Sequence, residues 1–213
     1  MYNVYHRARM NKHWFHFQSY VLTGKSSASI LDSYDNSEGI AAFDDIDFPR
    51  VATSFADFGG GPSDEAALYM KNKYDNIKHF FILDPFNRSF QHNIEMQSNI
   101  TSMGGVDIVT CMSVLNIIPT YRLRIHLISI MYEALKEGGY AYFKVWAGTW
   151  PERGSGRPTI DHSRNIFQAN KWADGFRNEV AKVFGARNVY VDNNMNLIVA
   201  KKTFSFGKSK RIL

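Results

Sequence analysis

The fold is decided by the stretch Val51-Ala-Thr-Ser-Phe-Ala-Asp-Phe-Gly-Gly-Gly-Pro-Ser63, in which an alternating apolar run enters three glycines. The run from Val51 to Phe58 predicts a strand. Ser63 can cap a following helix, and acidic residues come next, where the helix dipole favours negative charge. Glycines at such a turn let backbone amides approach a ligand, although a sharp corner alone would also explain them.

Outward from this turn, strand and helix patterns alternate. Apolar runs predict further strands over His79–Leu83, Val106–Cys111 and Tyr140–Trp146. Helical patterns begin after Ser63, after Pro119 and at Asn170, and the second is expected to end at Gly138-Gly139. A loop is expected from Gly148 to Arg164. Two runs joined by turn residues, Asn188–Val191 and Met195–Ala200, predict a terminal hairpin. The order predicts an α/β fold with a mostly parallel sheet.

Composition excludes several classes of protein. The chain has 213 residues, 45% of them hydrophobic, so it can bury a core. The single cysteine, Cys111, excludes an internal disulfide framework and a multi-cysteine zinc site. His13 and His16 have metal-binding spacing without an identifiable third ligand, so no metal is expected. Apolar runs are too short to cross a bilayer and no signal peptide is visible, so we expect a cytoplasmic protein without a membrane partner.

Charge is distributed unevenly along the chain. The net charge is +5, with basic residues near both ends and an acidic stretch from Asp32 to Asp47. Basic ends permit contact with nucleic acid, and a solubilising surface explains them equally well. We divide the chain into an N-terminal extension forming a helical cap (1–50), a main domain (51–203) and a basic tail (204–213).

Two carboxylates stand out beside the predicted turns. Asp57 lies two positions before the first glycine, where a dinucleotide site normally has an apolar residue. A carboxylate there suits a ligand with ammonium or sulfonium character. Asp84 ends the second strand and can accept hydrogen bonds from ribose hydroxyls, although Asp84-Pro85 can also simply begin a turn.

Together, Asp57, the glycines, Asp84, the strand after Gly138-Gly139 and the late hairpin resemble the class I S-adenosylmethionine-dependent methyltransferases over roughly Val51 to Lys202. The most specific part is Asp107-Ile-Val-Thr-Cys-Met-Ser-Val-Leu-Asn-Ile-Ile-Pro119, which looks like the fourth strand and the start of the next helix. The resemblance is closest to methyltransferases of bacterial and phage modification systems, with Asp84-Pro85-Phe86 as a further shared element. It implies a Rossmann-like fold with a seven-stranded sheet and a terminal antiparallel hairpin.

The resemblance also implies S-adenosyl-L-methionine as cofactor and assigns its contacts. Glycines 59–61 would lie against the methionine part, and Asp57 would lie near the methionine amine. Asp84 would hold the ribose and Phe86 would lie near the adenine. The wall at the end of the fourth strand would be formed by Met112 and Ser113. The cofactor-binding residues are therefore Asp57, Gly59, Gly60, Gly61, Asp84, Phe86, Met112 and Ser113.

The methyl acceptor is less clearly indicated. The Asn/Asp-Pro-Pro-aromatic motif of amino methyltransferases is absent after the fourth strand, and Cys111 is expected to be structural rather than nucleophilic. Lys144 lies in a segment that resembles the fifth strand of ribose 2′-O methyltransferases, where a lysine helps to deprotonate a hydroxyl. The rest of that tetrad is not evident, Asn196 stands roughly where its late glutamate would be, and a lysine reaching solvent is the alternative.

The loop after the fifth strand borders the place where methyltransferases bind their acceptor. Arg157, His162 and Arg164 are its candidate substrate-binding residues, with an exposed polar loop as the alternative. We expect transfer of the methyl group to an oxygen or nitrogen acceptor, with nucleic acid first and a small molecule second. A binding or scaffold protein that keeps the fold without the chemistry is the rival class.

Overall fold

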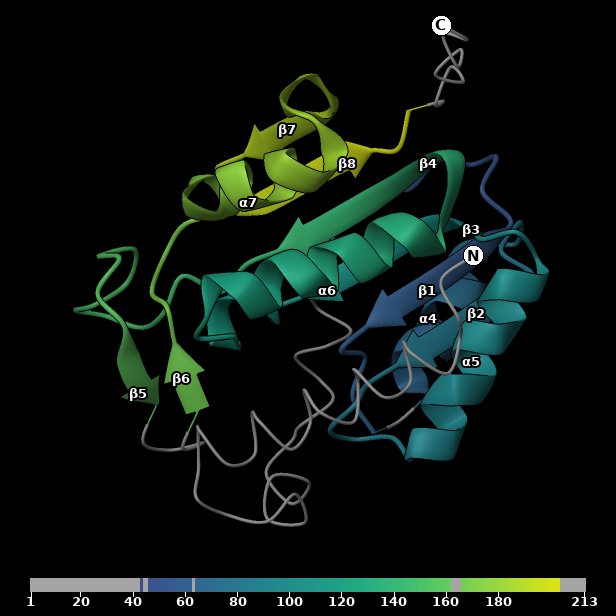
Figure 1. Ribbon diagram of the computed structural model, residues 1–213, viewed down its shortest axis with the longest axis horizontal. Helices are drawn as coiled ribbons and strands as arrows, with labels where there is room; N and C mark the ends of the chain where they lie inside the picture. The colour runs from purple at the N-terminus through teal and green to yellow at the C-terminus, as the bar shows by residue number, and fades with distance from the viewer. Residues whose placement is uncertain (1–42, 44–45, 63, 162–165, 204–213) are drawn as a thin grey trace, which may run out of the picture.

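The computed structural model describes residues 43, 46–62, 64–161 and 166–203 (Figure 1). The expected helical cap and the basic tail lie largely outside these residues. Within them, the main sheet has six strands in the order β2-β1-β3-β4-β8-β7, where seven were expected. The strands are β1 (Ser54–Phe58), β2 (His79–Leu83), β3 (Val106–Met112), β4 (Leu135–Lys144), β7 (Val189–Asp192) and β8 (Leu197–Lys201).

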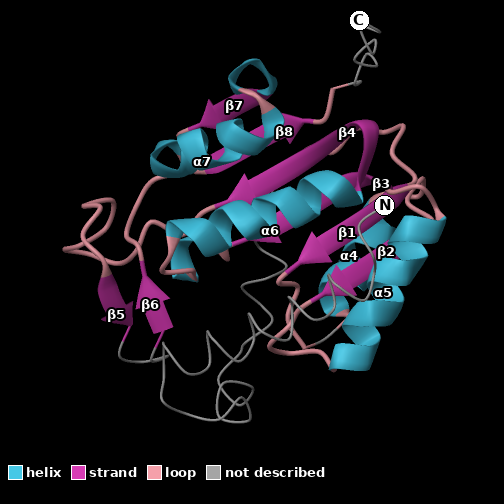
Figure 2. Ribbon diagram, viewed as in Figure 1, coloured by secondary structure: helices cyan, strands magenta, loops and turns pink. Residues whose placement is uncertain are grey.

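The first four strands are parallel, and β8 runs antiparallel to both of its neighbours, β4 and β7. This confirms the α/β class, the mostly parallel sheet and the terminal hairpin. A separate two-stranded sheet stands apart from the main sheet (Figure 2). Its strand β5 (Thr159–Asp161) lies within the stretch predicted as a loop, and β6 (Ile166–Gln168) lies just after that stretch.

Helices cover both faces of the sheet (Figure 1). One face packs against α5 (Phe90–Ser102), α6 (Tyr121–Ala134) and α7 (Asp174–Phe184). The other packs against α4 (Glu65–Lys73) and an aromatic segment that contains Phe43 and Phe48. Short 3-10 helices, η1 (Leu115–Ile117) and η2 (Ala186–Asn188), complete the described elements. None of the helices described here is long and apolar enough to span a bilayer.

Gly138-Gly139 does not end the helix that precedes it. The α6 helix stops at Ala134, and the chain enters β4 at once, so both glycines lie inside the strand. The register between β3 and β4 shifts there, because Val106 pairs with Leu135 and Ile108 pairs with Tyr140. Gly138 has a φ of +84°, which a side chain would oppose, so the glycines make a bulge rather than a cap.

Two side chains form hydrogen bonds between elements at the amino ends of the parallel strands. Asp107 Oδ2 accepts hydrogen bonds from the amides and hydroxyls of Thr53 and Ser54, and its Oδ1 accepts one from Lys136. Burial opposes ionisation of Asp107, but these donors outweigh it and lower its pKa to about 2. Lys202, just after β8, donates to the carbonyls of Tyr132 (3.0 Å) and Leu135 (2.6 Å) at the end of α6.

Candidate functional site

The strand order creates a switch point between β1 and β3. The chain leaves β1 for β2 on one side and then returns to β3 on the other. In open α/β sheets, ligands bind at such a point, outside the carboxyl ends of the strands. The loop Gly59–Gly61 follows β1 there, Asp84 follows β2, and Ser113 follows β3. The structure thus brings most of the predicted cofactor residues to one edge of the sheet.

Asp84 is buried and organises two loops. Its Oδ2 accepts hydrogen bonds from the Gly61 amide (2.9 Å) and the Asn87 side chain (3.0 Å). Its Oδ1 accepts from the amides of Phe86 (2.8 Å) and Asn87 (3.0 Å). A carboxylate has about four acceptor positions, so all of them are filled by the protein itself. A ribose hydroxyl can therefore reach Asp84 only by replacing one of these donors.

The Asn87 side chain is the donor best placed for replacement. Its Nδ2 bonds to Asp84, while its Oδ1 is buried with no hydrogen-bond partner within the described part of the chain. A buried acceptor without a donor is uncommon and calls for a missing partner. A pair of neighbouring hydroxyls could satisfy both oxygens, one donating to Asp84 Oδ2 in place of Asn87 Nδ2 and the other donating to Asn87 Oδ1.

Two residues that the sequence analysis did not identify also stabilise the loops around Asp84. Arg88 contacts the glycine loop, and Asn93 contacts the loop after β2. Arg88 donates from Nε to the Gly61 carbonyl at 2.8 Å and forms an ion pair with Asp64 at 2.9 Å. Gly61 thus has both backbone polar groups bound by the loop after β2. Asn93, buried on α5, accepts from the Asp84 amide and donates to the carbonyls of that same loop. Their spacing from Asp84 carried no recognisable signal.

The glycine loop lies directly over Asp57. A Cβ added to Gly60 would come within 2.7 Å of Asp57 Oδ2 and of Ile82 Cγ2, and one added to Gly59 would overlap Val114. The φ of Gly59 is also +90°. The close packing of this loop against Asp57, Ile82 and Val114 therefore requires glycine at both positions, independently of any ligand. The predicted cap, Ser63, lies outside the described residues, and Asp64 occupies the N-cap position of α4.

The pKa of Asp57 is strongly shifted. Its side chain is buried, and its Oδ1 accepts a hydrogen bond of 2.6 Å from Thr110. Burial raises the pKa of Asp57 to about 7; the Thr110 bond lowers it and the nearby charge of Asp84 raises it further. The carboxyl can thus hold or release a proton near neutral pH, and a cationic ligand would favour the ionised form.

The wall after β3 contains Met112 and Ser113. Met112 is buried, whereas Ser113 is exposed and has a φ of +56°, a left-handed conformation that is uncommon outside glycine. The Ser113 amide donates to the Lys144 carbonyl at 2.9 Å. Lys144 ends β4 and is paired with Met112, so the candidate base lies beside the predicted cofactor wall.

Asn196, which stands roughly where the late glutamate of the tetrad would be, binds two backbone groups. Its Oδ1 accepts from the Ala173 amide at 2.6 Å, and its Nδ2 donates to the Val145 carbonyl. The side chain therefore links the start of α7 to the end of β4. Cys111 is fully buried, and burial, with the Asp57 charge, raises the pKa of its thiol, as fits a structural cysteine.

A buried amide network lies next to this wall. Asn116 donates to Gln168 Oε1 at 2.9 Å, and Gln168 donates to the Trp146 carbonyl at 2.8 Å. Asn116 Oδ1 is buried without a hydrogen-bond partner in the described part of the chain. Of the predicted substrate residues, Arg157 is exposed on the neighbouring loop, whereas His162 and Arg164 lie outside the described residues.

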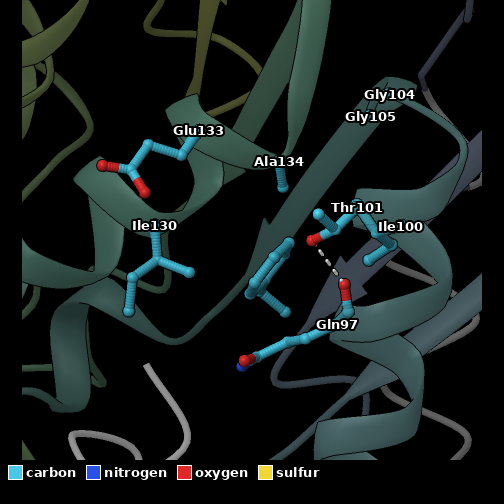
Figure 3. A pocket seen from close by; sticks show the side chains of 9 residues that line it. Gln97, Ile100, Thr101, Gly104, Gly105, Ile130, Glu133 and Ala134 are labelled. Atoms are coloured by element: carbon cyan, nitrogen blue, oxygen red, sulfur yellow. Dashed lines mark hydrogen bonds between the residues drawn. The ribbon is translucent and has the colours of Figure 1, made fainter. Parts of the chain in front are cut away.

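One hollow lies away from these residues, between α5 and α6 (Figure 3). Gln97, Thr101 and Glu133 supply polar side chains, and Phe58, Ile100 and Ile130 contribute apolar walls. It contains none of the predicted site residues and lies on the face of the sheet that packs against α5, α6 and α7. We therefore do not equate it with the predicted cofactor site.

Comparison with known proteins supports the fold. No family model and no curated protein matches the chain. Among solved structures, "PigF with SAH" matches with a TM-score of 0.54 and 16% identity, covering 94% of this chain and 70% of that one. CalS10, an amino pentose methyltransferase from Micromonospora echinaspora solved with SAM, matches with a TM-score of 0.44 and 17% identity over 95% of this chain and 98% of that one.

At these identities the PigF match shows a shared Rossmann-like fold. The CalS10 similarity is weaker and adds no argument. Neither match supports the closer resemblance to bacterial and phage modification enzymes that the sequence suggested.

Proposed function

We propose that this protein is an S-adenosyl-L-methionine-dependent methyltransferase that modifies an oxygen or nitrogen acceptor, with nucleic acid as the acceptor class. The observation that carries the proposal is the pair Asp57 and Asp84. The two carboxylates end adjacent parallel strands at the switch point, beneath and beside a glycine loop. Negative groups at this position match a ligand that carries an ammonium, a sulfonium and ribose hydroxyls.

Each acid has a separate part in binding. Ionised Asp57 would face the positive methionine end of the cofactor, below Gly60. Asp84 would accept a ribose hydroxyl that replaces the Asn87 amide, and Asn87 Oδ1 would accept the other hydroxyl. Phe86, whose amide is held by Asp84, would lie along the adenine. The bound cofactor supplies a methyl group on a positively charged sulfur.

The transfer itself needs alignment more than covalent chemistry by the protein. A lone pair of the acceptor forms the new bond to carbon, and the electron pair of the breaking bond stays on sulfur as a thioether. The acceptor loses its proton, and we assign the neutral amine of Lys144 as its recipient when the acceptor is a hydroxyl, so that Lys144 ends the step as an ammonium. Replacing Lys144 with Met should lower kcat at least ten-fold without changing cofactor affinity.

The scaffold alternative is favoured by one specific observation. All four acceptor positions of Asp84 are already used inside the protein, as expected if no ribose binds there. Calorimetric titration with S-adenosyl-L-methionine separates the two functions. The methyltransferase proposal expects binding that Asn87→Ala weakens and Asp84→Ala abolishes. Absence of binding to the wild-type protein would favour the scaffold.

Activity should be tested with cofactor labelled in its methyl group. Separate incubations with DNA, RNA and a pool of small metabolites distinguish the acceptor classes. Label in nucleic acid supports the full proposal, whereas label only in metabolites would retain the methyltransferase and overturn its acceptor. We also propose a cytoplasmic location, which agrees with the single, buried cysteine.

A further inference from the structure

Three exposed tryptophans lie on two segments that contact each other, the loop after β4 and the residues after β6. Trp146, Trp150 and Trp172 have exposed fractions of 51%, 88% and 39%. They are three of the four tryptophans in the sequence, and Trp14 lies outside the described residues. Indole rings are usually well covered, so exposed tryptophans on two contacting segments indicate a surface used for binding.

The backbone holds this segment as one unit. The Gly154 amide donates to the Ala147 carbonyl at 2.8 Å, and the Gly156 amide donates to the Asn170 carbonyl at 2.8 Å. Gly154 also lies so close to the Trp172 indole that a Cβ there would overlap the ring. The loop 146–157 and the segment 168–172 are therefore held against each other, and we call their exposed residues the tryptophan surface.

Cations accompany the rings. The Arg153 guanidinium lies 5.1 Å from the centre of the Trp172 ring, and Arg153 and Arg157 are both exposed. The one acid of the loop, Glu152, accepts a hydrogen bond from Ser155 at 3.1 Å. The surface thus combines flat aromatic faces with guanidinium groups that pair well with phosphate.

The tryptophan surface lies next to the candidate site. It begins where β4 ends, and Figure 1 shows the loop extending beyond the carboxyl end of that strand. Gln168 connects the Trp146 carbonyl to Asn116, in the segment after β3. A polymer lying on this surface could place one of its groups near the switch point.

We propose that the tryptophan surface binds single-stranded nucleic acid. Unpaired bases present flat faces that stack on indole rings, while phosphates contact Arg153 and Arg157. Paired bases are already stacked on each other, so a duplex cannot use the rings in this way. The inference rests on the proposed function in that it names the acceptor of the same site, but binding can be measured without any cofactor.

The test measures the affinity of the full chain for fluorescently labelled oligonucleotides of about 15 nucleotides, near the upper limit of a single-domain site. Single-stranded DNA, single-stranded RNA and the matching duplex are compared by anisotropy, with quenching of intrinsic tryptophan fluorescence as a second signal. We expect single strands to bind at least ten-fold more tightly than the duplex, with strong dependence on salt.

Two variants and one control probe the surface itself. Trp150→Ala should weaken single-strand binding about ten-fold, in the range found for removing one stacking ring. Arg157→Gln should weaken binding and reduce the salt slope by about 0.7, as expected for one lost phosphate contact. The control Tyr190→Ala removes an aromatic ring that is 65% exposed on β7, away from this surface, and should leave binding unchanged.

The outcomes are distinguishable. Absence of single-strand binding, or equal affinity of the Trp150→Ala variant and the wild type, would overturn the inference. A change in oligomeric state of that variant, seen by light scattering without nucleic-acid binding, would identify a protein interface instead. Cofactor binding without oligonucleotide binding would refute only this inference, whereas oligonucleotide binding without cofactor binding or methyl transfer would refute only the proposed methyltransferase.

Discussion

Replacing Asp57 with Asn should stabilise the folded protein at neutral pH. The unfolded carboxyl titrates near 3.8, and burial raises the pKa in the folded protein to about 7. Between these values the folded state keeps a proton that the unfolded state loses, so the stability of the wild type falls as pH rises. Three units at about 1.4 kcal/mol each give roughly 4 kcal/mol, complete above pH 7.

The Asp57→Asn variant mimics the protonated carboxyl at every pH and can still accept the Thr110 hydrogen bond at Oδ1. Its free energy of unfolding should equal that of the wild type below about pH 4 and exceed it progressively up to about pH 7. Urea denaturation at unit pH steps measures the difference. Asp75→Asn removes the same charge at an exposed position and controls for the change in net charge.

The same substitution should weaken cofactor binding above pH 7, because the variant cannot place a negative charge against the methionine amine. Binding to the wild type should release a proton near pH 6, detected by calorimetry in two buffers with different ionisation enthalpies. Parallel stability curves for the wild type and the variant, or a wild-type titration without proton release, would refute this account of Asp57.

Three further substitutions test other contacts. Gly60→Ala should displace the loop, because its Cβ would lie 2.7 Å from Asp57 Oδ2, and should lower cofactor affinity at least ten-fold by calorimetry. Arg124→Ala should cost about 3–5 kcal/mol in urea denaturation by leaving Glu179 buried and unpaired, and replacing both with apolar residues should recover most of it. Asp107→Ala should cost about 2 kcal/mol at pH 7, and the cost should shrink as acid protonates the wild-type carboxyl through its pKa of about 2.

The fold was largely predictable because it depends on local patterns. The apolar run His79–Leu83 became a parallel edge strand whose last three residues are buried, and the turn residues between Val191 and Leu197 became a hairpin. The predicted ends of helices and strands were less accurate where pairing between distant strands decides where an element ends. Leu135 continues the helical spacing, yet it pairs with Val106, and the strand therefore begins before the glycines.

The sequence predicted residues that lie together at the switch point, but not the hydrogen bonds that connect them. Asp57 and Asp84 were identifiable because the first lies near the end of a predicted strand and the second directly follows one. Arg88 and Asn93 were not, since their function depends on which carbonyls the folded loop turns toward them. The hairpin β5–β6 was missed because its strands have only three residues each, among glycines and charges.

The position of β8 has a consequence for a growing chain. This strand fills the place between β4 and β7, and Lys202 closes the end of α6 across a separation of 70 residues from Tyr132. Until residue 202 has been made, β4 presents an open edge and α6 lacks these donors. A nascent chain that lacks β8 would therefore expose an unpaired strand edge. Such an edge promotes aggregation and recruits chaperones.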